Sequence, residues 1–345
     1  MVYRWCERFD HLSQALSPLV AQPVLLFVLR RLASFVLTLG FTSLLVFAVL
    51  EWLPGNAAQV ILGETATPES LQALEQKLGL DQPTLMRYLS WVGALLQGRT
   101  GLSMAYDVPT FELIAERLQV TLPLALMALF ITVTLALASG LYAAAHQNRP
   151  GDVGVMTLTQ LGLSVPNFWL AILLVLLFAV QLGWVSAGGF PGWTEEAGGG
   201  LTEGLRALLL PALSLAAVQT AILARVTRSA VLDVLREDFV RTARAKGLGH
   251  RQVLWGHVLR NAMIPVVTVM GLQFGNLLTG AIVIENVFVL PGIGRLVFQA
   301  IANRDLVVVR DVVMLLAAMV ILINFAVDLL YLWIDPRIRG GRRGA

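Results

Sequence analysis

The sequence predicts an all-α integral membrane protein with six transmembrane helices. Of its 345 residues, 57% are hydrophobic and only 14% are charged, and the mean hydropathy is +0.74. Ordinary soluble domains have about 45–50% apolar and about 25% charged residues. This composition excludes a soluble globular fold and a disordered chain, and a single cysteine, Cys6, excludes a disulfide scaffold.

Six mostly apolar runs are each long enough to cross a bilayer core, which takes roughly 20 residues of helix. Backbone polar groups in lipid must pair within the segment, so these runs are expected to be helices rather than strands. They cover residues 32–50, 118–145, 153–185, 207–224, 261–284 and 312–334. Pro166 and Pro265 are expected to kink the third and fifth spans.

The segments around the spans define the domain organisation. We expect an N-terminal extension of unassigned function, an interfacial helix with the first span, an extracytoplasmic helical cap, a five-helix core with a cytoplasmic loop at 225–260, and a basic tail. Their boundaries are 1–23, 24–51, 52–117, 118–335 and 336–345. In the cap, Thr67-Pro68-Glu69 predicts a helix start, and residues 83–97 predict an amphipathic helix. The length of the cap is compatible with a linker or a docking surface.

Charge sets the expected orientation. An even number of spans puts both termini on one side, and most of the Lys and Arg residues lie in the segments of that side. The positive-inside rule therefore places both termini in the cytoplasm. The acidic residues have the opposite bias.

The cytoplasmic loop at 225–260 contains a short amphipathic helix. Leu235, Phe239 and Ala243 recur every four residues and predict an apolar face, and Gly247 predicts the end of the helix. Arg241 and Arg244 project elsewhere. The basic charge alone suits anionic lipid headgroups and a partner protein equally.

Several short motifs resemble one family of transport proteins. Residues 241–247 read Arg-Thr-Ala, three residues, then Gly, and residues 259–265 read Leu-Arg-Asn-Ala-Met-Ile-Pro. Leu53-Pro54-Gly55, Ser164–Trp169, Glu285–Phe288, Pro291–Gly294, Asn303–Asp305 and Asp335–Arg337 follow the same pattern. Over about residues 24–339 the chain resembles inner-membrane permeases of ABC importers, in the dipeptide/oligopeptide/nickel branch. That branch departs in this way from the usual Glu-Ala-Ala of the loop.

This resemblance implies a type I importer permease in the bacterial inner membrane that is not itself an enzyme. The chain would form half of a translocation path with a second homologous permease, in contact with membrane lipid. An extracytoplasmic binding protein would deliver peptides or a related solute such as nickel; nucleic acid is not an expected partner. Two cytoplasmic ATPases would supply ATP and Mg, so no cofactor is expected in this chain. They would contact Asp238, Phe239, Arg241, Thr242, Ala243, Arg244, Lys246 and Gly247.

Polar residues inside the spans are candidates for the translocation path. They are Ser164, Asn167, Gln273, Asn276 and Asp328. Each has an alternative role: the neutral side chains can hydrogen-bond between helices, and Asp328 can cap a helix or pair with an arginine. The four histidines do not cluster, so no metal site is expected.

Two other functional classes are weaker alternatives. A self-sufficient secondary transporter or channel predicts paired intramembrane charges or inverted repeats, and the sequence offers one intramembrane acid and no clear repeat. A membrane enzyme predicts a cluster of catalytic side chains within the spans. The sequence also lacks a Walker loop for ATP, and Pro291–Gly294 is expected to form a turn or re-entrant segment.

Overall fold

The computed structural model describes residues 3–52, 62, 67–77 and 80–334, and this part of the chain is built from helices. Its only β-type pairing is an isolated bridge between Leu102 and Pro109. The expected basic tail at 336–345 and the Leu53-Pro54-Gly55 motif lie outside the described residues. The all-α prediction is confirmed.

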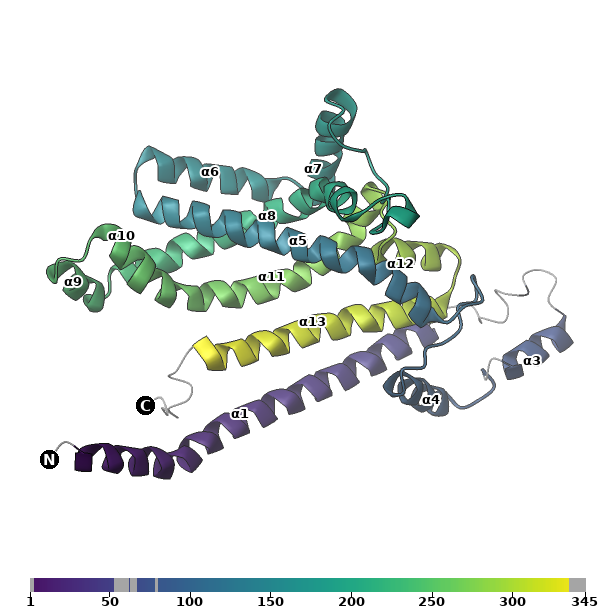
Figure 1. The fold of residues 1–345 in the computed structure, drawn as a ribbon. Coiled ribbons are helices and arrows are strands. Elements are labelled where there is room, and N and C mark those ends of the chain that lie inside the picture. The colour runs from purple at the N-terminus through teal and green to yellow at the C-terminus, as the bar shows by residue number, and fades with distance from the viewer. Residues whose placement is uncertain (1–2, 53–61, 63–66, 78–79, 335–345) are drawn as a thin grey trace.

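Five helices are long and apolar enough to cross a membrane (Figure 1). They are the 26–52 part of α1 (Tyr3–Trp52), α5 (Thr110–Ala145), α8 (Leu201–Leu235), α11 (Leu259–Val287) with the turns before it, and α13 (Leu306–Ile334). The first span and the residues expected to form an interfacial helix belong to one continuous helix, α1.

The third expected span is not one straight helix. It consists of α6 (Pro150–Ser164) and α7 (Asn167–Leu174), extended by a π-helical segment at Val175–Gln181, and the two parts are bent by 101°. Pro166 has no N–H to donate, and it restricts the preceding Val165 to an extended conformation. A sixth crossing therefore depends on counting this bent pair as one span. Pro265, in contrast, lies inside the continuous helix α11.

Helix α8 is at the centre of the bundle and packs against α5, α6, α7 and α11. Helices α1 and α13 pack against each other beside this group (Figure 1). Arg31 on α1 forms an ion pair with Asp328 on α13, with 2.9 Å between Nη1 and Oδ2. The alternative expected for Asp328, an ion pair with an arginine, is therefore present.

The two ends of the bundle differ. Figure 1 places the short helices α9 (Asp238–Ala245) and α10 (His250–Val253) at one end, with the end of α13 and the start of α1 on the same side. At the opposite end lie α3 (Pro68–Lys77), α4 (Thr84–Leu96) and α12 (Ile293–Ala302). The start of α3 is as predicted: Thr67 Oγ1 accepts a hydrogen bond from the Ser70 N–H, and Pro68 is the first helical residue.

Helix α12 is seated on a buried carboxylate. The Gly294 N–H donates to Glu285 Oε2 at 2.7 Å, and Thr121 Oγ1 donates to Glu285 Oε1 at 2.5 Å. The Ile293 N–H completes the group by donating to Thr121 Oγ1. The start of α12 lies so close to α11 that a Cβ on Gly294 would overlap the backbone of Ile282. The segment expected to form a turn or re-entrant segment thus leads into a short helix, α12. This helix can pack so closely on α11 only because residue 294 is a glycine.

Two further buried acids fix the start of α13 to α4, to α5 and to the loop between them. Asp305 accepts hydrogen bonds from Ser103 Oγ at 2.6 Å and from the Val308 N–H, so it also caps α13. Asp311 accepts hydrogen bonds from Trp91 Nε1 at 3.1 Å and Thr110 Oγ1 at 2.6 Å. Buried carboxylates need such donors, so this part of the expected cap is rigidly attached to the bundle.

Candidate coupling and translocation site

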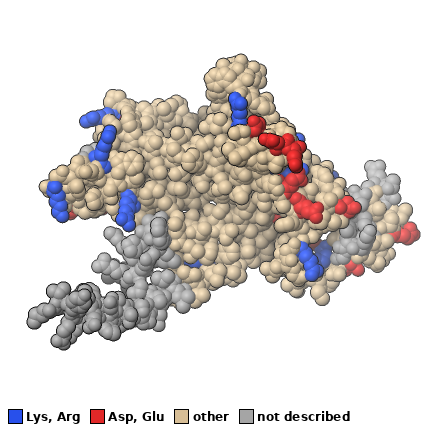
Figure 2. Space-filling model, viewed as in Figure 1, with Lys and Arg blue, Asp and Glu red and all other residues tan. Residues whose placement is uncertain are grey.

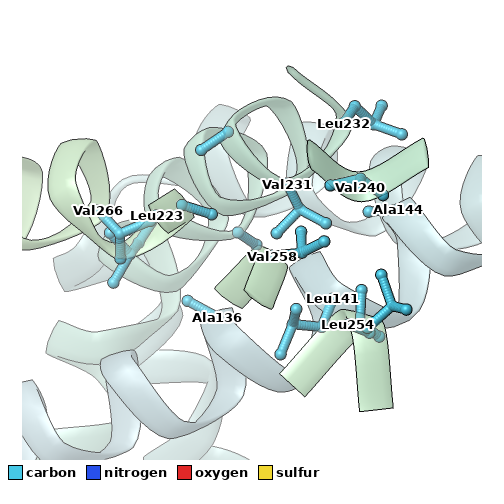
Figure 3. Packing of buried hydrophobic residues seen from close by; sticks show 14 of the residues in the cluster. Ala136, Leu141, Ala144, Leu223, Val231, Leu232, Val240, Leu254, Val258 and Val266 are labelled. Atoms are coloured by element: carbon cyan, nitrogen blue, oxygen red, sulfur yellow. The ribbon is translucent and has the colours of Figure 1, made fainter. Parts of the chain in front are cut away.

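Helix α9 is amphipathic and is anchored in the bundle by one face. Val240 is fully buried and Ala243 is 7% exposed. Figure 3 shows Val240 in a cluster with Val231 and Leu232 of α8 and Leu141 and Ala144 of α5. The same cluster includes Leu254, Val258 and Val266, which lead into and along α11. A displacement of α9 would therefore be transmitted to α5, α8 and α11 together.

The anchored face differs from the one predicted. Phe239 is 41% exposed, and Val240 occupies the buried position expected for it. The four-residue spacing was counted from Leu235, but α8 ends there and the chain turns at Arg236 before α9 begins. The periodicity of one helix does not continue across such a turn. Within α9, Val240 and Ala243 are three residues apart, a spacing that also places two side chains on one face.

The exposed face of α9 is basic and has few partners within the chain. Arg241, Arg244 and Lys246 are exposed, as are Asp238, Phe239 and Thr242. Arg241 pairs with Asp238 at 3.5 Å, an i, i+3 contact between two highly exposed side chains. Such a pair contributes little to stability. The candidate coupling residues are thus divided: Ala243 is anchored in the core, and the charged side chains are presented outward.

Gly247 ends α9 in a left-handed conformation, with φ +84°. Its N–H donates to the Arg244 carbonyl at 2.9 Å, and the Leu248 N–H donates to the Ala243 carbonyl at 3.3 Å. These two bonds form a Schellman motif, in which glycine is favoured because an L side chain is strained at positive φ. The predicted helix end at Gly247 is confirmed. No atom lies within 4 Å of a Cβ built on Gly247, so only the backbone conformation restricts this position.

A buried ion pair braces the same end of the bundle. Arg228 on α8 donates through Nε and Nη2 to the two oxygens of Asp152 on α6, both at 2.6 Å. The Asn148 N–H donates to the same carboxylate, whose side chain is 4% exposed. Neither residue was among the predicted functional residues, although Asp152 is the acid at the boundary of an apolar run.

The five residues predicted to line the translocation path lie in three different places in the structure. Ser164 and Asn276 are exposed, and Asn167 lies beside Gly280, one turn after Asn276 on α11. The structure therefore brings Asn167 and Asn276 to one surface of α7 and α11, with Ser164 at the adjoining end of α6. Gln273 is buried and donates to the Gln219 carbonyl at 3.1 Å. Asp328 is at the separate contact between α1 and α13.

Comparison with known proteins shows which family the chain belongs to. Residues 136–340 match the family described as the inner membrane component of binding-protein-dependent transport systems, and residues 24–136 match the model of its N-terminal part. The chain belongs to this family. It is a multi-pass membrane protein and a permease subunit of an ABC transport system.

Individual relatives cover most of the chain. A protein of Brucella abortus named putative peptide transport system permease is 43% identical over 90% of this chain and 98% of its own length. The di/tripeptide permease DppB of Pseudomonas aeruginosa is 40% identical over 92% and 100%. The glutathione permease GsiC of Escherichia coli is 41% identical over 91% and 98%. The predicted resemblance to this family is confirmed.

The fold of the core is also found in a solved transporter. A chain of the MetNI methionine ABC transporter, in an inward-facing conformation, covers 65% of this chain and 97% of its own, with a TM-score of 0.53 and 18% identity. At this identity the similarity concerns the fold alone. It supports an ABC importer permease fold.

Proposed function

We propose that this permease forms half of the translocation path of an ATP-driven importer for peptides or a related small solute such as nickel. The observation that carries the proposal is helix α9, with Val240 and Ala243 anchored in the bundle and a basic face presented outward. Two ATPase subunits would bind this face and supply ATP and Mg. A second homologous permease would complete the path. The names of the relatives support peptides as the substrate class.

The proposed orientation puts α9 in the cytoplasm of a bacterial cell, with both termini on the same side of the inner membrane. Figure 2 shows almost only Lys and Arg among the charged residues at the end of the bundle that holds α9, whereas Asp and Glu gather at the opposite end, where some Lys and Arg also lie. Such a distribution is typical of a cytoplasmic basic end. A reporter fused after residue 150 is expected to be cytoplasmic and one at residue 75 extracytoplasmic; the opposite pair of signals would contradict the orientation.

The proposed path runs along the surface that carries Ser164, Asn167 and Asn276. Polar side chains exposed to hydrocarbon are unfavourable, so this surface is better suited to an aqueous path between two permeases than to lipid. Gln273 would support this surface from the core, and Asp328 would hold α1 against α13 rather than contact substrate.

The extracytoplasmic binding protein is proposed to dock at the acidic end. The exposed acids there include Asp107, Glu112, Glu116, Glu195, Glu196 and Glu203. Reversing two of them in Glu195→Lys/Glu196→Lys should slow association and reduce its salt dependence. Asp233→Lys adds positive charge at the other end and is the control. Equal association rates for the two variants, measured by surface plasmon resonance, would contradict docking at this end.

Uptake by the reconstituted complex tests the function. Proteoliposomes holding both permeases and both ATPases should accumulate a labelled dipeptide only with ATP on the ATPase side and the binding protein on the other. A self-sufficient secondary transporter would accumulate it from an ion gradient without these partners. Uptake by this chain alone would therefore overturn the proposal. Labelled nickel, used in a parallel assay, distinguishes the two substrate classes.

A further inference from the structure

Helix α4 has an apolar face that no other part of the described chain covers. Leu85, Met86, Leu89 and Leu96 are between 56% and 85% exposed. Their spacings of three, four and seven residues put them on one side of the helix. An exposed apolar surface of this kind requires an explanation in a segment expected to lie outside the membrane.

The opposite face of α4 fixes the helix against the end of α1. The Phe47 ring on α1 lies 5.4 Å from the Tyr88 ring and 5.9 Å from the Trp91 ring, measured between centroids. The hydroxyls of Ser43 and Tyr88 are hydrogen-bonded at 2.9 Å. Trp91 also donates to Asp311, so the position of α4 is fixed by two spans. The apolar face is therefore held outward by the packing on the other side.

The charge pattern of α4 points to lipid. Its only charged residue, Arg87, forms an ion pair with Glu51 of α1, and the apolar face carries no charge. Tyr88 and Trp91 lie on the other side, against α1, so the apolar face presents only leucine and methionine side chains. A face prepared for a soluble binding protein would be expected to have a polar rim.

The exposed face of α4 also continues an exposed apolar surface on the first span. On the neighbouring span, Leu44, Leu45 and Val49 are each about half exposed, and Trp52 is 88% exposed. Phe47 precedes the end of α1 by five residues, which corresponds to about 7–8 Å along a helix. Interfacial helices are embedded by about 5–10 Å. In Figure 1, α4 is viewed nearly end-on while α1 and α13 run across the page, so α4 lies across the spans.

We propose that α4 is an interfacial helix whose Leu85, Met86, Leu89 and Leu96 side chains are embedded in the leaflet at the acidic end of the bundle. The occupant of this face is bilayer lipid. The helix would keep the loop between α4 and α5, to which Asp305 is bonded, at a fixed depth next to the acidic surface. This inference goes beyond the proposed function and does not depend on the substrate.

The test labels one introduced cysteine at a time, which is possible because the sequence has a single native cysteine to replace. In a Cys6→Ser background, Leu89→Cys is labelled with an environment-sensitive fluorophore, and the complete complex is placed in nanodiscs. Leu44→Cys on α1 is the control for lipid, and Glu195→Cys in the acidic loop is the control for water. The label at position 89 should be quenched several-fold more by lipids that carry a spin label near the headgroup than the label at 195. Iodide, a quencher that stays in the water, should leave the fluorescence of the label at position 89 nearly unchanged, as it should for the label at position 44.

Two results would overturn the proposal. Quenching of the label at position 89 by iodide, and not by spin-labelled lipid, would mean that the face is in water. Protection from both quenchers, or protection that develops only when the binding protein is added, would mean that a protein covers it. Because each label replaces an exposed side chain, the variants are expected to fold, and their melting curves check this.

Discussion

Replacing Gly247 with valine should uncouple ATP hydrolysis from transport while leaving the protein inserted in the membrane. Gly247 ends α9 at φ +84°, a conformation that a β-branched residue adopts only with strain. Such strain costs about 1–3 kcal/mol, and a difference of that size changes conformational populations by roughly fivefold to 150-fold. The Schellman bonds at the end of α9 should therefore open, and the basic face should lose its fixed position.

Two control variants separate strain from loss of space. Gly247→Asn should retain much of the activity, because asparagine tolerates the left-handed region better than valine. Gly249→Ala changes a nearby glycine that is not at positive φ and whose added Cβ would lie 3.7 Å from Gln252 Oε1; it should behave as the wild type. Uptake of labelled dipeptide into proteoliposomes measures the effect. If Gly249→Ala and Gly247→Val impaired uptake equally, strain at positive φ would not be the cause.

Replacing Gly294 with alanine should have the largest effect on stability. The added Cβ would overlap the Ile282 backbone, which cannot rotate away as a side chain can. Overpacking of this kind typically costs about 1–3 kcal/mol. Displacement of α12 would also remove the Gly294 N–H from Glu285, and leaving a buried polar group without its hydrogen bond costs about 1–3 kcal/mol. The sum is a large part of a typical folding free energy of about 5–15 kcal/mol.

Thermal unfolding of the detergent-solubilised protein measures this loss. Gly294→Ala should melt well below the wild type and accumulate poorly in the membrane. Gly40→Ala on α1 has no atom within 4 Å of the added Cβ, so it should melt as the wild type does. If both variants had the same melting temperature as the wild type, the close approach of α12 to α11 would not exist in the folded protein.

The sequence predicted the helices well because apolar runs of this length have one stable form in a membrane. It also predicted the helix end at Gly247, since glycine has a specific role there. It predicted a kink at Pro166 but not its size, a bend of 101° between α6 and α7. The apolar character continues through Val165 and Pro166, and how far a proline bends a helix depends on the packing around it.

The buried polar contacts could not be predicted because they join distant parts of the chain. Asp311 meets Trp91, and Glu285 meets Thr121, across more than one hundred positions. Each of these acids lies at the end of an apolar segment. An acid in that position is usually interpreted as the boundary of a membrane span, so its buried hydrogen bonds are not expected. The burial of Val240 was missed for a different reason, because the helical period was counted across the turn at Arg236.

The central claim is that α9 transmits ATPase movements to the bundle through its anchored face. The most direct measurement is the stimulation of ATP hydrolysis by the substrate-loaded binding protein in the reconstituted complex. Wild type and Gly249→Ala should both respond to the loaded binding protein, whereas Gly247→Val should insert normally but lose most of the response, by about tenfold or more. A full response in Gly247→Val, with normal uptake, would contradict this role of α9.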